Sequence, residues 1–124
     1  MRFILLAGLH LLAVSSAAAQ QRAQLFGAIR DSSGAVIQNA AVSVLEIDTG
    51  IRRSARSNPE GFYAISSLSP GRYKVTVRKD GFRTVARLGV RLEATQTGRL
   101  DFLLEIGNMH ETVTVEGGAA LVNT

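Results

Sequence analysis

The chain has 124 residues, of which 46% are hydrophobic and 19% charged, and it contains twelve Gly, two Pro, no Cys and no Trp. This composition predicts one ordinary globular domain, and it excludes a large multidomain protein as well as disulfides, thiol catalysis and thiolate metal sites. The formal net charge of +4 is small and the arginines are spread along the chain, so the charge does not indicate nucleic-acid binding.

The N-terminal segment has the pattern of a secretory signal peptide. Residues 3–14 form an almost unbroken apolar run after Arg2, and small residues follow it. The run is about 12 residues long, which suits a signal-peptide core and is short of the roughly 20 residues that span a membrane. Ala17 and Ala19 form a small-x-small cleavage pattern. We therefore expect a signal peptide over 1–19, cleavage after Ala19, and an exported mature chain without a transmembrane segment.

Beyond residue 20 the sequence predicts β-strands and no helix. No segment sustains apolar residues at helical spacing, while turn signals such as Asn-Pro, Pro-Gly and Asp-Gly recur roughly every eight to twelve residues. Alternation of apolar and polar residues predicts the first strands, in chain order, over 24–31, 40–47, 51–57, 61–65 and 72–79. The predicted core positions in this part are Leu25, Gly27, Ile29, Val42, Val44, Tyr63, Ile65, Leu68, Tyr73, Val75 and Val77.

Charge marks one of these segments as an edge strand. Arg52, Arg53 and Arg56 fall within 51–57, and charged side chains at a sheet edge discourage pairing with another chain. In the next strand, Phe62 alternates with the core positions, so we expect its ring on the opposite side.

The last predicted strands are shorter. Asp80-Gly81 predicts a hairpin turn, followed by two short strands over 82–85 and 88–92 and a closing strand over 99–106. In the closing strand, the residues expected on one face are Leu100, Phe102, Leu104 and Ile106. The pattern weakens after Gly107, so a flexible tail is expected there, and disorder is as plausible for it as a strand.

The residue inventory predicts no catalytic residue, no cofactor-binding residue and no metal ligand. His110 is the single histidine after the predicted cleavage site, and Thr114 stands where a zinc-binding helix needs a second histidine. The serines lie mostly in turn clusters, and none follows the Gly-x-Ser-x-Gly pattern of a nucleophile. The carboxylates show no spacing typical of a paired general acid and base. We therefore expect that the chain is not an enzyme and needs no cofactor.

An ordered series of motifs carries a family resemblance. It consists of the segments 27–37 and 40–44, Asn-Pro-Glu-Gly-Phe-Tyr at 58–63, Leu-Ser-Pro-Gly-Arg-Tyr-Lys-Val-Thr-Val at 68–77, and Gly-Phe at 81–82. Together they resemble the carboxypeptidase regulatory-like domain over about residues 24–106. The resemblance implies a seven- or eight-stranded antiparallel β-sandwich, Ig-like or transthyretin-like (prealbumin-like), of the carbohydrate-binding-like type. It implies no peptidase activity, because in that family the module accompanies a catalytic domain or another partner.

The tail carries a second resemblance. Residues 111–124 are similar to the segment that joins this module to the plug of TonB-dependent outer-membrane receptors. This resemblance implies a sandwich domain over 20–107 and a linker over 108–124, at the N-terminal end of such a receptor. It also implies a location in the periplasm or in association with the outer membrane.

Two functions remain open at this stage. The first is a non-catalytic accessory module that contacts a receptor or another envelope protein, through the predicted edge strand or through a strand added by the tail from Glu111. The alternative is carbohydrate binding, with Phe62 expected beside Arg72 and Lys74. The candidate contact residues are Arg52, Arg53, Arg56, Phe62, Arg72 and Lys74.

Overall fold

The computed structural model describes residue 8, residues 21–116 and residues 122–123. The predicted signal peptide, apart from residue 8, and its cleavage site lie outside these residues, as does most of the predicted linker beyond residue 116. In the part of the chain that is described, no helix is long and apolar enough to cross a membrane.

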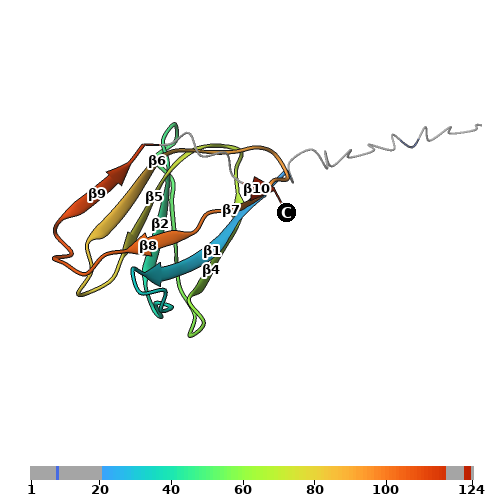
Figure 1. The fold of residues 1–124 in the computed structure, drawn as a ribbon. Helices are drawn as coiled ribbons and strands as arrows, with labels where there is room; N and C mark the ends of the chain where they lie inside the picture. Colours follow the sequence, from blue (N-terminus) through green and yellow to red (C-terminus); the bar gives the residue numbers. More distant parts are fainter. Residues whose placement is uncertain (1–7, 9–20, 117–121, 124) are drawn as a thin grey trace, which may run out of the picture.

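The described chain folds into two β-sheets that pack face to face (Figure 1). One sheet has the order β10-β7-β1-β4, with β8 also paired to β1, and its strands are β1 Ala23–Asp31, β4 Phe62–Leu68, β7 Thr97–Arg99, β8 Phe102–Leu104 and β10 Val122–Asn123. The other has the order β3-β2-β5-β6-β9, and its strands are β2 Ala41–Glu46, β3 Arg52–Arg56, β5 Gly71–Arg78, β6 Thr84–Leu92 and β9 Thr112–Val115. The predicted all-β sandwich and the edge position of β3 are confirmed.

The sheets are not purely antiparallel, contrary to the expectation from the family resemblance. β7 and β8 both pair with β1 in parallel, and β9 pairs with β6 in parallel. The strand total also differs, because the described residues contain ten strands rather than seven or eight. The additional strands are short and arise where one predicted strand is interrupted and where the predicted tail joins a sheet.

The core lies between the sheets and follows the predicted alternation. Its largest fully buried side chains include Leu25, Ile29, Val42, Val44, Val75, Val77, Leu92 and Leu104. Burial of one such side chain contributes roughly 1.5 to 3 kcal/mol. Tyr63 joins β4 to the β7–β8 segment of the same sheet, because its hydroxyl donates a hydrogen bond to the Leu100 carbonyl and its ring lies 6.1 Å from that of Phe102. Burial, assisted by the charge of Asp101, raises the pKa of Tyr63 well above its ordinary value.

Residues 82–92 differ from the prediction of two short strands. They form one strand, β6, that begins at Thr84 and contains a β-bulge opposite β5. Tyr73 pairs with Val90 and Val75 pairs with Arg87, so two residues of β6 face one of β5. Gly89 in the bulge has φ of 68°, a conformation that favours glycine. The bulge interrupts the alternation, which is why the sequence suggested a break.

The predicted closing strand 99–106 is interrupted as well. It forms β7 and β8, and the two meet at Leu100 and Asp101, where the Asp101 carboxylate replaces a backbone acceptor and receives the Ala28 N–H at 2.8 Å. Three of its four predicted core residues, including Leu100, are buried. The fourth, Ile106, is 82% exposed. That prediction is wrong, because β8 ends at Leu104 and the chain then turns away from the core.

The segment predicted to be a flexible tail begins as part of the sandwich. β9 extends the second sheet along β6, from the pair Thr84 and Thr112 to the pair Arg87 and Val115. The connection before it is held by Arg83, which forms ion pairs with Glu105 at 3.5 Å and with Glu111 at 3.2 Å. The tail strand therefore pairs with this chain's own sheet.

Two candidate binding faces

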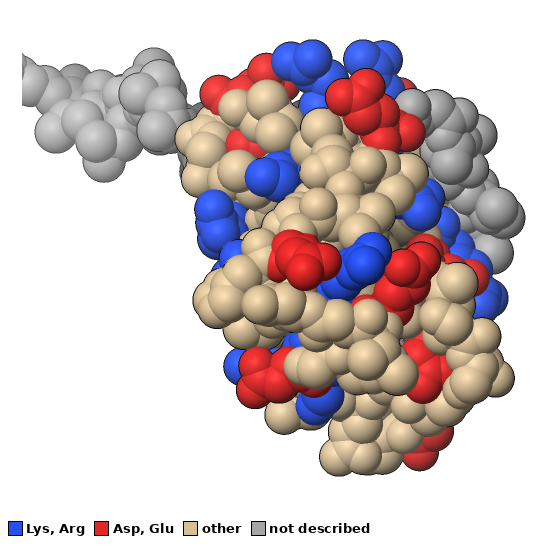
Figure 2. All heavy atoms as spheres, turned by 60° about the vertical axis from the view of Figure 1, so that its left-hand side comes forward, with Lys and Arg blue, Asp and Glu red and all other residues tan. Residues whose placement is uncertain are grey.

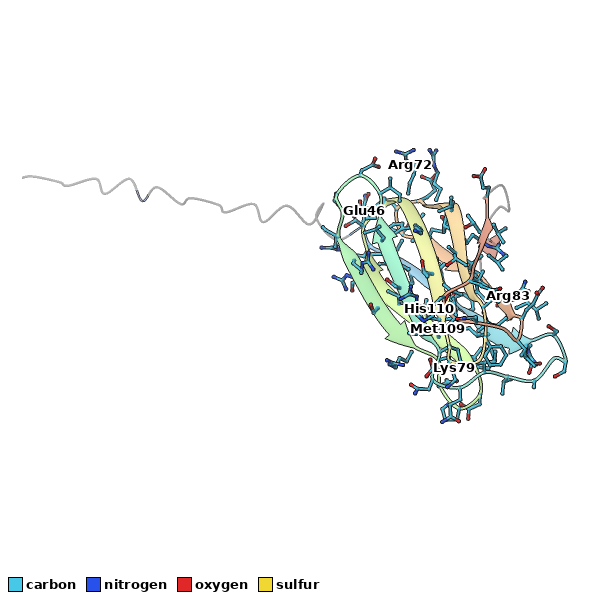
Figure 3. The ribbon with its side chains drawn as sticks, turned by 90° about the vertical axis from the view of Figure 1, so that its left-hand side faces the viewer. Glu46, Arg72, Lys79, Arg83, Met109 and His110 are labelled. Carbon is cyan, nitrogen blue, oxygen red and sulfur yellow. The ribbon has the colours of Figure 1, made fainter. Side chains whose placement is uncertain are left out.

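The structure separates the candidate contact residues onto different faces. Phe62 lies on the outer side of the sheet that contains β1, whereas Lys74 lies on the outer side of the sheet that contains β5. The expectation that Phe62 stands beside Arg72 and Lys74 is therefore wrong, because residues close in sequence belong to opposite sheets. Arg72 lies near one end of β5 (Figure 3) and is paired with Asp48 at 2.9 Å.

The three arginines of β3 also divide between two sides. Arg52 and Arg56 pair with Leu45 and Ala41, whose side chains face outward. Arg53 pairs with the core residue Val44 and therefore points toward the space between the sheets at their open edge. It lines a small hollow there together with Arg22, Val44, Glu46, Ile51, Ser67, Leu68, Ser69 and Tyr73.

Among the titratable groups that line this hollow, Tyr73 has a shifted pKa. Partial burial and the negative charge of Glu46 raise the pKa of its hydroxyl, which donates a hydrogen bond to the Ser69 carbonyl at 2.6 Å. Tyr73 is therefore a neutral, structural phenol at physiological pH.

The outer side of the first sheet is rich in apolar side chains, and we call it the apolar face. Strand pairing places its residues in three neighbouring rows: Ala64, Phe26 and Arg99, then Phe62, Ala28 and Asp101, then Val36, Arg30 and Leu103. Three of the apolar side chains are substantially exposed, with Phe62 at 46%, Val36 at 42% and Leu103 at 60%. Isolated apolar residues are normal on a surface, but neighbouring ones on one sheet indicate a contact surface.

Charged groups border the apolar face. The guanidinium of Arg99 lies 5.8 Å from the centre of the Phe26 ring and pairs with Asp101 at 3.2 Å. A hollow of about 240 Å³ lies among Ala28, Arg30, Arg99, Asp101, Phe102 and Leu103. The face therefore combines exposed apolar groups with hydrogen-bond donors and an acceptor at their margin.

The outer side of the second sheet has a different chemistry, and we call it the cationic face. Its rows across the strands are Arg56, Ala41 and Arg78, then Ser54, Ser43, Thr76, Ala86 and Thr114, then Arg52, Leu45 and Lys74. Small side chains occupy the centre and long ones the ends, which leaves a hollow of about 250 Å³ over the sheet. Figure 3 views this sheet face on, with Arg72 toward one end of the strands and Lys79 toward the other.

Charges of both signs occur next to the cationic face, around the connection before β9. On the side of the molecule shown in Figure 2, Lys and Arg side chains alternate with Asp and Glu side chains. The ion pairs of Arg83 with Glu105 and Glu111 illustrate this mixing near β9. An extended field of one sign, of the kind that binds nucleic-acid backbones, is not apparent on that side.

The described residues contain no cluster of side chains that could hold a metal ion. No three His, Asp or Glu residues in the described part lie close enough to share a metal ion. His110 is exposed beside Met109 on the connection before β9 (Figure 3), and its backbone N–H donates to the Asn108 side chain at 2.9 Å. His110 lies in a turn that is closed by a hydrogen bond from the Glu111 N–H to the Asn108 carbonyl at 2.9 Å.

The comparison with protein families decides the relationship of the chain. The family model of the carboxypeptidase regulatory-like domain matches residues 24–105. The chain belongs to this family. The predicted resemblance is thereby confirmed over most of the described residues, whereas no curated protein matches the sequence.

Solved structures share the fold of this carboxypeptidase regulatory-like domain. One is a putative carbohydrate binding protein from Bacteroides uniformis, with 18% identity, a TM-score of 0.56, and coverage of 66% of this chain and 40% of that one. Another is a chain of an N-terminal interface mutant of the type II cohesin–X-dockerin complex from Acetivibrio cellulolyticus, with 20% identity, a TM-score of 0.52, and coverage of 70% of this chain and 60% of that one. A third is the hydroxyquinol 1,2-dioxygenase from Pseudomonas putida, with 12% identity, a TM-score of 0.55, and coverage of 69% and 57%. The chain spans less than two thirds of each of them, and these identities show a common fold alone.

Sequence reasoning found Phe62 but missed the residues that surround it. Leu103 alternates with the correctly predicted core residues Phe102 and Leu104, so the same pattern could have predicted that its side chain faces outward. Val36 lies outside the named strands and reaches the face through an isolated bridge to Arg30, for which no local sequence signal exists.

Proposed function

We propose that the chain is a non-catalytic, exported accessory module of the cell envelope that binds a protein partner through the apolar face. The observation that carries the proposal is the exposure of Phe62, Val36 and Leu103 on the same face of one sheet, with Phe62 and Val36 on one side of β1 and Leu103 on the other. Protein interfaces are built around a few aromatic and apolar anchors, with arginines enriched among them. On the apolar face, Arg30 and Arg99 are the arginines in this position.

The energetic gain from docking is appreciable. A full transfer of a phenylalanine side chain out of water contributes roughly 1.5 to 3 kcal/mol. Phe62 is 46% exposed, and a partner can bury this remaining surface. Phe62 alone then supplies about 1 kcal/mol, and Leu103, which is 60% exposed, supplies a similar amount. These side chains form the centre of the proposed interface.

The envelope location rests on the sequence features of the two ends. The signal-peptide pattern of residues 1–19 supports export. The similarity of residues 111–124 to the segment before the plug of TonB-dependent receptors supports a role as the N-terminal extension of such a receptor, in the periplasm or at the outer membrane. Pairing of β9 with β6 is compatible with this role, because it ties the start of the segment to the sandwich.

An affinity experiment tests the proposed interface. The tagged chain, its Phe62→Ala variant and an Ile47→Ala control are expressed in cells that export them, and envelope proteins retained by each are compared. Ile47 is 50% exposed but lies outside the apolar face, so it matches Phe62 in exposure. We expect a discrete protein retained by the wild type and the control and lost with Phe62→Ala. Equal retention by all three, or none by the wild type, contradicts the proposal.

Carbohydrate binding at the same face is the alternative function. The exposed ring of Phe62 can stack on a sugar, and the adjoining hollow offers Arg30 and Asp101 as polar groups. The fold shared with the carbohydrate binding protein from Bacteroides uniformis agrees with this alternative but does not argue for it independently. A glycan array separates the two functions: a signal that Phe62→Ala abolishes supports sugar binding, and a signal equal to that of the variant excludes it.

A further inference from the structure

We propose that the cationic face is a second binding site, for an acidic polysaccharide whose carboxylates contact the cations and whose hydroxyls contact the central row. This inference goes beyond the proposed function, because the apolar face lies on the other sheet and has a different composition. The ligand class follows from the charges, the hydroxyls and the lack of aromatic rings in the lining of the hollow.

Four cations form a frame at the ends of the cationic face: Arg52, Lys74 and Arg78 line its hollow, and Arg56 borders an adjoining one. Arg56 and Arg78 flank Ala41 in one row, and Arg52 and Lys74 flank Leu45 in another. With strand spacings of about 4.8 Å and a rise of about 3.3 Å per residue, the frame measures about 10 Å across the strands and about 13 Å along them. A ligand that carries repeated anionic groups can contact several of these cations at once.

These four cations are not neutralised by ion pairs within the described residues. The ion pairs found there involve Arg72, Arg83 and Arg99 instead. Arg56 donates hydrogen bonds to the carbonyl and side-chain oxygens of Asn39, which leave its charge uncompensated. An acidic group at this end is Asp80, which borders an adjoining hollow with Arg56, Arg78 and Lys79. Repulsion among the cations favours an anion over the hollow.

The centre of the face supplies hydroxyl groups. Ser54, Ser43 and Thr76 stand side by side on β3, β2 and β5, and Thr114 continues the row on β9 beyond Ala86. A hydroxyl both donates and accepts hydrogen bonds. The row can therefore pair with the hydroxyls of a saccharide chain laid across the strands, between the two rows of cations.

The composition of the face argues against a protein and against a neutral sugar. Leu45 is the one large apolar side chain that lines the hollow, so the face lacks the apolar centre of a protein interface. No aromatic side chain lines it either, and neutral sugars depend on stacking. The attraction must then come from charge, so the expected ligand is a polysaccharide with acidic residues.

Binding of a uronic-acid polymer tests the site. Polygalacturonate is titrated with the full-length chain exported by its expression host, beside fully methyl-esterified polygalacturonate and polyglutamate as probes. We expect binding of polygalacturonate that disappears in 1 M salt, where the screening length falls to about 3 Å. The esterified polymer should not bind, because it lacks the charge. Polyglutamate should bind about fivefold more weakly, because it lacks the hydroxyls and a hydrogen bond contributes about 1 kcal/mol.

Matched variants assign the binding to this face. Each exposed cation contributes about two- to fivefold to affinity, so the double variant Arg52→Gln with Lys74→Gln should bind polygalacturonate about tenfold more weakly. Thr76→Val, which removes the hydroxyl at similar volume, should weaken polygalacturonate but leave polyglutamate unchanged. Arg30→Gln, which removes a cation from the apolar face on the other sheet, should leave the affinity for polygalacturonate unchanged.

The outcomes also separate this site from the proposed function. Phe62→Ala should bind polygalacturonate as the wild type does, whatever its effect on a protein partner. Equal affinity for polyglutamate, an unaffected double variant, or no binding of polygalacturonate overturns the acidic-polysaccharide site and leaves the apolar face untouched.

Discussion

A single buried hydroxyl joins two connections of the sandwich, and its removal should destabilise the fold measurably. Ser57 follows β3 and is 5% exposed. Its hydroxyl donates to the Ile37 carbonyl at 2.7 Å and accepts the Ala40 N–H at 2.8 Å. Ala40 is fully buried, so water cannot readily replace the lost acceptor. In Ser57→Ala both backbone groups lose their partner.

The expected size of the effect follows from those two groups. A buried polar group left unsatisfied costs about 1 to 3 kcal/mol, and the pair should lower the free energy of unfolding by about 2 to 4 kcal/mol. For a domain of this size the unfolding temperature should fall by roughly 10 to 20 °C. Urea denaturation measures the change, which should appear as a lower midpoint at an unchanged slope.

Ser66→Ala is the matched control, because Ser66 is exposed on β4. It should change the free energy of unfolding by less than about 0.5 kcal/mol. A change that small in Ser57→Ala would refute the role assigned to the hydroxyl.

Two further predictions concern the backbone and pH. Gly61 has φ of 81°, and a Cβ there would lie 2.8 Å from the Cβ of Val36, so Gly61→Ala should destabilise the chain by at least about 2 kcal/mol. Gly34→Ala, at φ of 88° in open space, should cost only about 1 kcal/mol, and equal midpoints in urea would contradict the steric explanation. The second prediction follows from the raised pKa of Tyr63. Because the unfolded phenol ionises near pH 10 and the buried one does not, stability should be complete below that pH and fall above it by up to about 1.4 kcal/mol per pH unit. Tyr63→Phe should make this alkaline decline shallower, and an unchanged decline would contradict the burial effect.

The sequence predicted those parts of the fold that depend on local alternation. Tyr73, Val75 and Val77 alternate with charged and hydroxyl residues, and all three are buried as expected. The bulge at Gly89 and the carboxylate bond from Asp101 to Ala28 break that alternation, so one strand was divided and another was drawn as continuous.

Contacts between distant segments were beyond local patterns. The pairing of β9 with β6 joins residues far apart in the chain, and no local pattern near Thr112 predicts which strand it pairs with. The same limit affected the candidate site. Phe62 and Lys74 are twelve positions apart, yet sheet assignment places them on opposite faces, while strand register places Val36 and Leu103 on the same face as Phe62.

The most direct test of the central claim, that the apolar face holds a protein partner, is photo-crosslinking in intact cells that express and export the chain. A photoreactive phenylalanine derivative is placed at position 62 and, as a control of similar exposure, at position 47. The proposed function predicts a discrete protein adduct from position 62 and none from position 47. No adduct at position 62, or the same adducts from both positions, would contradict it.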